Sequence, residues 1–145
     1  PVGGDAHFVY ASVVGAAEEH TGFVWNNDLV SDDLGNVYVT GGYTGPVDFD
    51  PGPEILELST IPSQPGSPNP YVRSAYVQAF DPTGKHRWVT QLTGQSIGFS
   101  IDQDRDGNLC VAGSFRGELS VEIDGLQVTH HTIQNDSEYF YHIIG

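Results

Sequence analysis

Two stretches of the chain have an aliphatic side chain at every second position. In the first, Val37 and Val39 alternate with Tyr38 and Thr40. In the second, "LCVA" from Leu109 has the same alternation. A period of two is that of a β-strand, whose successive side chains point to opposite faces of a sheet. Both stretches follow the sequence Asp-x-x-Gly-Asn, which favours a tight turn. Each is therefore predicted to be a turn followed by a strand.

The two stretches are copies of one pattern with an offset of 72 residues, from Gly35 to Gly107. Around the first copy the chain is "SDDLGNVYVTGGYTGPVDFD", and around the second "QDRDGNLCVAGSFRGELSVEID". The further aligned pairs are Asp32 with Asp104, Gly41 with Gly113, Tyr43 with Phe115, and Gly45 with Gly117. Self-similarity over this length predicts a structural repeat.

A second strand pattern occurs three times, as "AHFVYAS" from Ala6, "SAYVQAF" from Ser74 and "SEYFYHI" from Ser137. The middle copy leads into "DPTGKHRW", where a turn is expected before a new strand at Trp88. We expect residues 1–22 to hold the last strand of a preceding unit and a connector. A first complete unit is expected over 23–87, with a Pro- and Ser-rich surface insertion over 59–72, and a second over 88–145.

A repeat of about four strands, over roughly 40–50 residues plus insertions, is typical of a β-propeller blade. The predicted fold class is all-β, with about two to two-and-a-half four-stranded antiparallel blades. A closed propeller needs about four to eight blades, and an open arc would expose sheet edges. The units would therefore belong to a longer protein, or close a ring from several copies, or pack as a β-sandwich.

Three segments also resemble the bacterial β-propeller repeat family known as SBBP repeats: "DLGNVYVTGGYTGPVDFDPGP", "SAYVQAFDPTGKHRWVTQLTG" and "DRDGNLCVAGSFRG". The resemblance covers most of Gly4 to Gly145, although "SVEIDGLQVTHH" replaces the family's "DFDPG"-like strand in the second unit. It implies a non-enzymatic recognition or scaffolding module on an exported or cell-surface bacterial protein, secreted or periplasmic. The partner would be a protein, a polysaccharide, flanking blades or other copies of the chain.

Charge narrows the classes of partner. The 145 residues include 19 acidic and 5 basic side chains, for a formal net charge of −14. Nucleic-acid binding is not expected, because it needs Lys and Arg to neutralise phosphates. The charge also disfavours anionic membrane surfaces. Membrane insertion is not expected, because no apolar run approaches the roughly 20 residues that span a bilayer. The single cysteine, Cys110, lies within a predicted strand, where we expect a buried small side chain.

The clearest candidate for a metal site is "DQDRDGN". Asp102, Asp104 and Asp106 alternate before Gly107, as the carboxylates do at the start of a calcium loop. The position of the closing bidentate Glu is occupied by Gly113. The alternatives are a calcium ion that stabilises the domain, or a polar turn whose Asp side chains bond to the backbone. No other cofactor is expected.

The sequence evidence for a catalytic site is weaker than that for the metal site. Asp48 and Asp50 flank Phe49 in "VDFDPGP", where paired carboxylates could bind a cation, flank a glycosidic bond in a glycosidase, or simply form a turn. There is no Gly-x-Ser-x-Gly motif and no phosphate-binding loop. The repeat-associated aromatic residues could stack on sugars, although packing between sheets is the simpler role. The alternative to a recognition module is a segment of a propeller-type carbohydrate-active enzyme.

Overall fold

The structure is a computed structural model that describes residues 10–11, 13–15, 22–123, 126–131 and 137–144. Within these residues every regular element is a strand and all pairings between strands are antiparallel, which confirms the all-β fold class. In the same part of the chain, no helix is long and apolar enough to cross a membrane. The strands are β1 (Phe23–Ser31), β2 (Val37–Thr44), β3 (Pro46–Asp48), β4 (Glu57–Ser59), β5 (Ser74–Phe80), β6 (His86–Gln103), β7 (Leu109–Ile123), β8 (Leu126–His131) and β9 (Ser137–Ile144).

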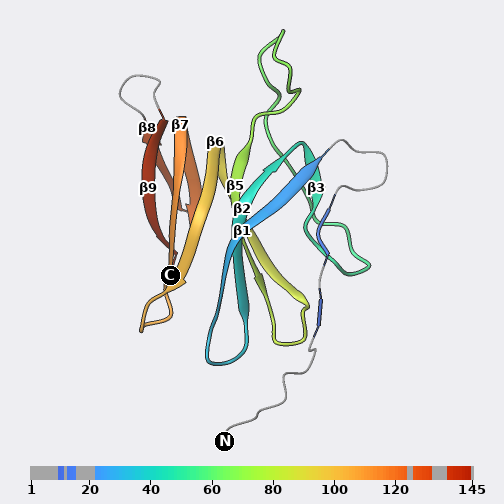
Figure 1. Cartoon of the computed structure of the whole chain (residues 1–145), viewed down its shortest axis with the longest axis vertical. Coiled ribbons are helices and arrows are strands. Elements are labelled where there is room, and N and C mark those ends of the chain that lie inside the picture. Colours follow the sequence, from blue (N-terminus) through green and yellow to red (C-terminus); the bar gives the residue numbers. More distant parts are fainter. Residues whose placement is uncertain (1–9, 12, 16–21, 124–125, 132–136, 145) are drawn as a thin grey trace, which may run out of the picture.

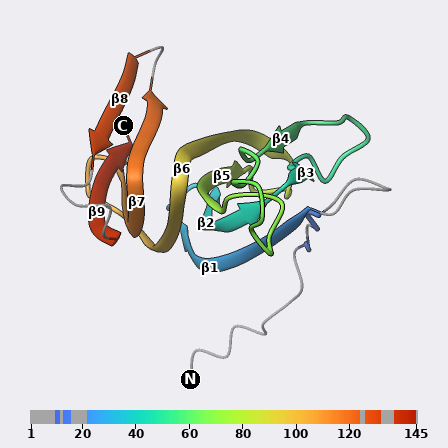
Figure 2. The same cartoon turned by 90° about the horizontal axis from the view of Figure 1, so that it is seen from above.

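One large sheet contains most of these strands. Its order is β1-β2-β5-β6-β7-β8, with β9 also paired to β7, while β3 and β4 form a separate small sheet. The 18-residue β6 joins two groups of strands, because its first part pairs with β5 and its second part with β7. Figure 2 shows β6 curving from the group of β1, β2 and β5 to the group of β7, β8 and β9. The number of blades and the unit boundaries stay predictions.

The sequence repeat is also a repeat of strand register. We call β1 with β2 the first hairpin, and residues 95–103 of β6 with residues 109–116 of β7 the second hairpin. The first hairpin has a bulge between Asn26 and Asp28, and the second has one between Gly98 and Ser100. The paired residues on either side also match at an offset of 72: Phe23 with Thr44 and Gln95 with Arg116, then Asp28 with Thr40 and Ser100 with Ala112. Since a bulge is a local design feature of a strand pair, the two hairpins are the same structural element.

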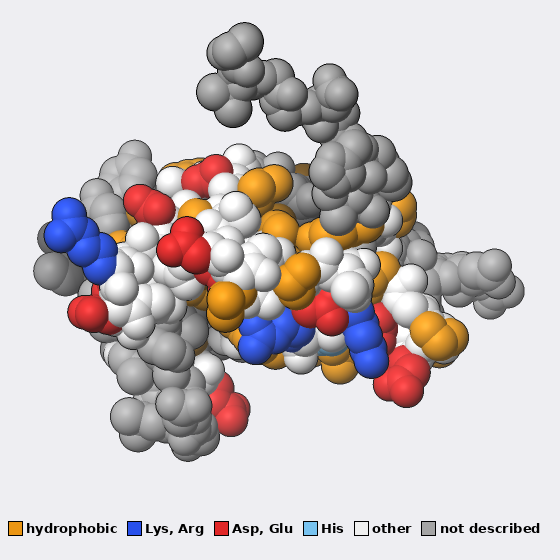
Figure 3. Space-filling view, turned by 90° about the horizontal axis from the view of Figure 1, so that it is seen from below, with side chains coloured by type: hydrophobic (Ala, Val, Ile, Leu, Met, Phe, Trp, Pro, Cys, Tyr) orange, Lys and Arg blue, Asp and Glu red, His pale blue; other side chains and the backbone are white. Residues whose placement is uncertain are grey.

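An Asp-x-x-Gly turn closes three hairpins at one end of the molecule, which is the lower end in Figure 1. In each, the glycine N–H donates to the carbonyl of an aspartate three residues earlier, and the glycine has a positive φ that other residues rarely adopt. The pairs are Asp32 with Gly35 (φ 83°), Asp81 with Gly84 (φ 83°) and Asp104 with Gly107 (φ 89°). Figure 3 looks onto this end, where acidic, basic and apolar side chains are interspersed.

Two apolar clusters cover opposite faces of β2 and β5. We call the face toward the second hairpin the inner face; it carries Tyr38, Ala75, Val77 and Ala79. The outer face carries Tyr43 and Tyr76, which pack with Val47 and Phe49. Both faces are covered along β5, so every residue from Ser74 to Phe80 is buried. These two faces determine how the units stack.

The Pro- and Ser-rich insertion is on the surface and mostly exposed, as the sequence predicts. It is nevertheless an ordered hairpin over residues 61–72. The N–H of Val72 donates to the carbonyl of Ile61 (2.9 Å), and the N–H of Ser63 to that of Pro70 (2.9 Å). Figure 1 shows this hairpin projecting beyond the ends of β2 and β5. Most of the first "AHFVYAS" copy lies outside the described residues.

Candidate functional site

The candidate calcium residues lie in and beside the turn between β6 and β7. The two carboxylate oxygens of Asp104 accept bonds from the N–H groups of Asp106 and Asn108 (2.9 Å each) and from the Asn108 side chain (2.8 Å). These bonds lower the pKa of Asp104, and the bond from the Asn108 side chain has the largest effect. Asp102 accepts a bond from the N–H of Gln103 (2.8 Å). Among the described residues, no three His, Cys, Asp or Glu side chains are grouped as metal ligands. Calcium binding stays a prediction.

Asp48 and Asp50 both bond to the backbone of the loop between β3 and β4. One oxygen of Asp48 accepts the N–H groups of Asp50 (3.0 Å) and Leu56 (2.9 Å). Asp50 accepts the N–H of Gly52 (2.7 Å). These bonds are those of a turn, which is one of the three roles that the sequence left open.

The second hairpin packs against the inner face of the first unit. Its apolar residues Ile101, Leu109 and Val111 are 4%, 3% and 0% exposed, and they belong to the cluster that contains the inner-face residues. These side chains of the second hairpin are thus buried in the same cluster as the inner face of β2 and β5. The burial of these apolar side chains stabilises the contact between the two units.

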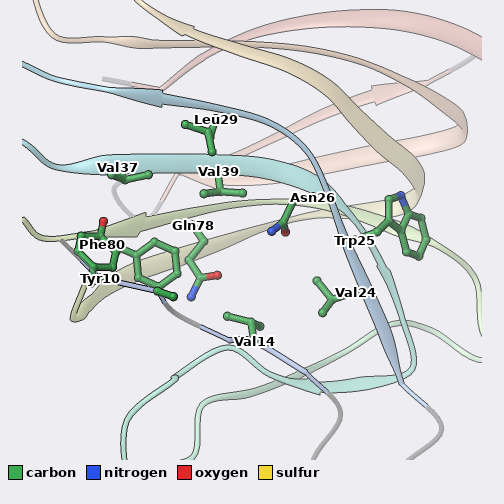
Figure 4. A pocket seen from close by; sticks show the side chains of 11 residues that line it. Tyr10, Val14, Val24, Trp25, Asn26, Leu29, Val37, Val39, Gln78 and Phe80 are labelled. Atoms are coloured by element: carbon green, nitrogen blue, oxygen red, sulfur yellow. The ribbon is translucent and has the colours of Figure 1, made fainter. Parts of the chain in front are cut away.

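The same three positions on the first hairpin are Leu29, Val37 and Val39, and they are less well covered. Leu29 is 62% exposed, Val37 is partly exposed and Val39 is 8% exposed. With Gln78 and Phe80 they line a pocket of about 260 Å³ on the outer face. Figure 4 shows these side chains around the pocket, which Tyr10 also lines. The outer face of the first hairpin is therefore an open copy of a surface that is closed in the second.

A polar contact at the two bulges holds the hairpins together. One carboxylate oxygen of Asp28 accepts bonds from the hydroxyl of Ser100 (2.8 Å) and the backbone N–H of Ile101 (3.0 Å). The side chain of Asn27 donates to the carbonyl of Gly98 (2.7 Å). The bond from Ile101, followed by that from Ser100, lowers the pKa of Asp28. The bulges thus align two strands that are far apart in sequence.

The expectation that Cys110 is buried is wrong. Cys110 is exposed, because it lies on the face of β7 that points away from Leu109 and Val111, and only the latter face packs on the first unit. Aromatic packing is confirmed where side chains are described: Tyr43 and Phe49 meet edge to face with centroids 5.1 Å apart. The side chains of Tyr139 and Tyr141 lie outside the described residues.

Similarity to known proteins supports a repeat architecture. The uncharacterized WD repeat-containing protein L264 of Acanthamoeba polyphaga mimivirus is 30% identical to this chain over 116 residues, or 76% of the chain. The match covers 8% of that relative's length, so the chain corresponds to a small part of it. No family model and no solved structure matches the chain. The chain is thus similar to a propeller-like repeat protein, and membership of the bacterial SBBP family stays a prediction.

Sequence reasoning missed Asp28 and Leu29. A signal for Leu29 was present, because its counterpart at an offset of 72 is the equally apolar Ile101. No such signal existed for Asp28, whose counterpart is Ser100. Its role depends on a contact between two bulges, which the sequence does not reveal.

Proposed function

We propose that the chain is a non-enzymatic, repeat-based protein-interaction module, in which the open outer face of the first hairpin receives a sheet face of the same kind as the inner face. One observation carries the proposal. Leu29, Val37 and Val39 occupy the repeat positions of residues that are buried against such a face within the chain.

Burial energetics support this pairing. An apolar side chain such as Leu29 contributes roughly 1.5–3 kcal/mol when it is fully removed from water, and 62% of its surface is still exposed. A covering face would also close the pocket beside Gln78 and Phe80. The partner need not be charged, since the lining of this pocket contains no Asp, Glu, Lys or Arg.

The name of the similar viral protein refers to WD repeats, and a scaffold of stacked units is compatible with that likeness. An exported or cell-surface bacterial setting, secreted or periplasmic, remains part of the proposal on the strength of the SBBP resemblance alone. The carbohydrate-active enzyme remains the alternative hypothesis. Asp50, Glu54 and His86 line one further pocket of about 690 Å³, where that alternative could be examined.

Sedimentation equilibrium of the chain over a range of concentrations tests the proposal, because the chain itself carries a second unit that can serve as partner. We expect a discrete oligomer. Leu29→Asp should raise its dissociation constant by at least about tenfold, as expected when a central apolar contact is lost. Leu34→Asp is the matched control: Leu34 is 80% exposed but lies in the β1–β2 turn, outside the outer-face pocket.

Two results would contradict the proposal. The first is a chain that stays monomeric at every concentration. The second is an equal loss of association in Leu29→Asp and Leu34→Asp, which would mean that added negative charge, and not the outer face, is responsible.

A further inference from the structure

A second hollow lies between the start of β1 and the hairpin of residues 61–72, and it shares Trp25 with the outer-face pocket. It has a volume of about 790 Å³ and is lined by three aromatic rings, those of Phe23, Trp25 and Tyr71. We call it the hairpin groove. Phe23 is 69% exposed, and Trp25 and Tyr71 are half-buried. The groove therefore presents apolar ring surface to solvent, whereas most other aromatic side chains whose burial the structure describes are buried.

The repeat does not require these rings. The counterparts of Phe23 and Trp25 in the second hairpin are Gln95 and Ile97. Tyr71 lies in the insertion and has no counterpart in the second unit. The equivalent stretch is longer in the first unit, because "SAYVQAF" begins 29 positions after Gly45, whereas "SEYFYHI" begins 20 positions after Gly117. Aromatic residues that depart from the repeat are not explained by the packing of one sheet on the next.

Two of the rings are held in place by glycines. A Cβ atom on Gly42 would lie 2.6 Å from the indole ring of Trp25. One on Gly45 would lie 3.1 Å from the ring of Tyr71, and Gly45 has a positive φ of 68°. Rings that pack this closely on the backbone are fixed before a ligand arrives, which lowers the entropy cost of binding.

Part of the polar lining consists of side chains with unused hydrogen-bonding capacity. Within the described part of the chain, the side chains of Gln64, Asn69, Arg73 and Gln95 have no hydrogen-bond partner. Amides both donate and accept. The lining contains no Asp or Glu although the chain carries 19. A cationic ligand therefore has no counter-charge here.

We infer that the hairpin groove binds a neutral oligosaccharide. The flat apolar face of a pyranose ring matches an exposed aromatic ring, and sugar hydroxyls, which donate and accept, match amide side chains. A proline-rich peptide also docks on aromatic grooves, but its backbone offers mainly carbonyl acceptors, which leaves the amide oxygens of Gln64, Asn69 and Gln95 without donors. The sugar uses both kinds of group.

The test is a titration of the chain with cellohexaose, xylohexaose and laminarihexaose, followed by tryptophan fluorescence. The chain has two tryptophans, and Trp88 packs near Tyr38 (centroids 6.2 Å apart), outside the groove lining. We expect a saturable change with one site per chain for at least one hexasaccharide. The change should disappear in Trp25→Phe and persist in Trp88→Phe; because Trp25 also lines the outer-face pocket, the assignment to the groove depends on Phe23, which lines the groove and not that pocket.

Phe23→Ala is expected to weaken binding by about tenfold or more, without a change in melting temperature, because Phe23 is largely exposed. Phe99→Ala is the matched control, since Phe99 is a second exposed phenylalanine (45%) that does not line the groove. The inference is overturned if no hexasaccharide binds at millimolar concentration by calorimetry. It is also overturned if the two Phe variants bind equally, or if a proline-rich decapeptide binds and the sugars do not.

Discussion

The contact between Asp28 and the second hairpin is the most informative place to perturb the structure. Asp28→Ala removes the acceptor of the Ile101 N–H and the Ser100 hydroxyl in one step. Ile101 is 4% exposed, so its N–H would be left without a partner in a buried position. A hydrogen bond to a charged group contributes about 1.5–3 kcal/mol, and an unsatisfied buried donor costs a similar amount. Because Asp28 itself is partly exposed, we use the lower end of this free-energy range.

The expected loss in the free energy of unfolding is therefore about 1.5–2 kcal/mol. For a domain of this size it corresponds to a fall in melting temperature of roughly 4–8 °C. Thermal and urea unfolding at neutral pH measure it. The matched control is Asp33→Ala, because Asp33 is an exposed aspartate near the same hairpin and removing it changes the net charge equally.

The pH dependence supplies a second check. The pKa of Asp28 in the folded chain lies below its ordinary value of 3.8, first because of the bond from Ile101 and then because of that from Ser100. A lowered pKa means that the stabilisation is complete above the unfolded value and is lost as pH falls through the folded one. The difference between wild type and Asp28→Ala should therefore shrink as the pH drops below 3.8. Melting temperatures of Asp28→Ala and Asp33→Ala within about 1 °C of each other at neutral pH would refute the reasoning.

Four other substitutions test local features by thermal unfolding. Tyr43→Phe should raise the melting temperature, because the Tyr43 hydroxyl is buried with no hydrogen-bond partner in the described part of the chain. Tyr76→Phe should lower it, because the Tyr76 hydroxyl donates to the side chain of Asn26 on β1. Equal shifts in the two variants would contradict this. Gly98→Ala should destabilise by about 1–3 kcal/mol, since a Cβ would lie 2.2 Å from the Thr40 hydroxyl oxygen at the contact between the units; wild-type stability would be inconsistent with that contact. Asp104→Ala should lower the melting temperature in chelator as well as in calcium, because the backbone bonds exist without an ion; a loss confined to calcium-loaded protein would assign the carboxylate to an ion.

The local elements were predictable from short sequence signals. The turns follow from Asp-x-x-Gly, whose aspartate and glycine act within four residues of each other. The buried face of the second hairpin follows from the alternation of Leu109 and Val111. These features depend on neighbours in the sequence, and the period of two is a property of any strand.

The arrangement of the units was less predictable. The sequence predicts a new strand near Trp88, but β6 begins at His86 and continues to Gln103, so that one strand serves both groups. The exposure of Cys110 depends on which face of β7 is covered, and both faces carry small or apolar side chains. The aromatic residues of the hairpin groove come from segments with no repeat signal, and only the fold brings Phe23 and Tyr71 to one hollow.

The central claim is that the outer face of the first hairpin accepts the kind of face that covers the second. Cross-linking measures this directly, because Cys110 is the only thiol of the chain and is exposed on the uncovered face of β7. Leu29→Cys/Cys110→Ser carries its thiol on the outer face alone. Mixed with the unmodified chain and a short bismaleimide, it should yield a cross-link between position 29 of one copy and position 110 of the other. A Leu34→Cys/Cys110→Ser control should give little. Equal yields from the two variants, or cross-links only between identical positions, would contradict the account.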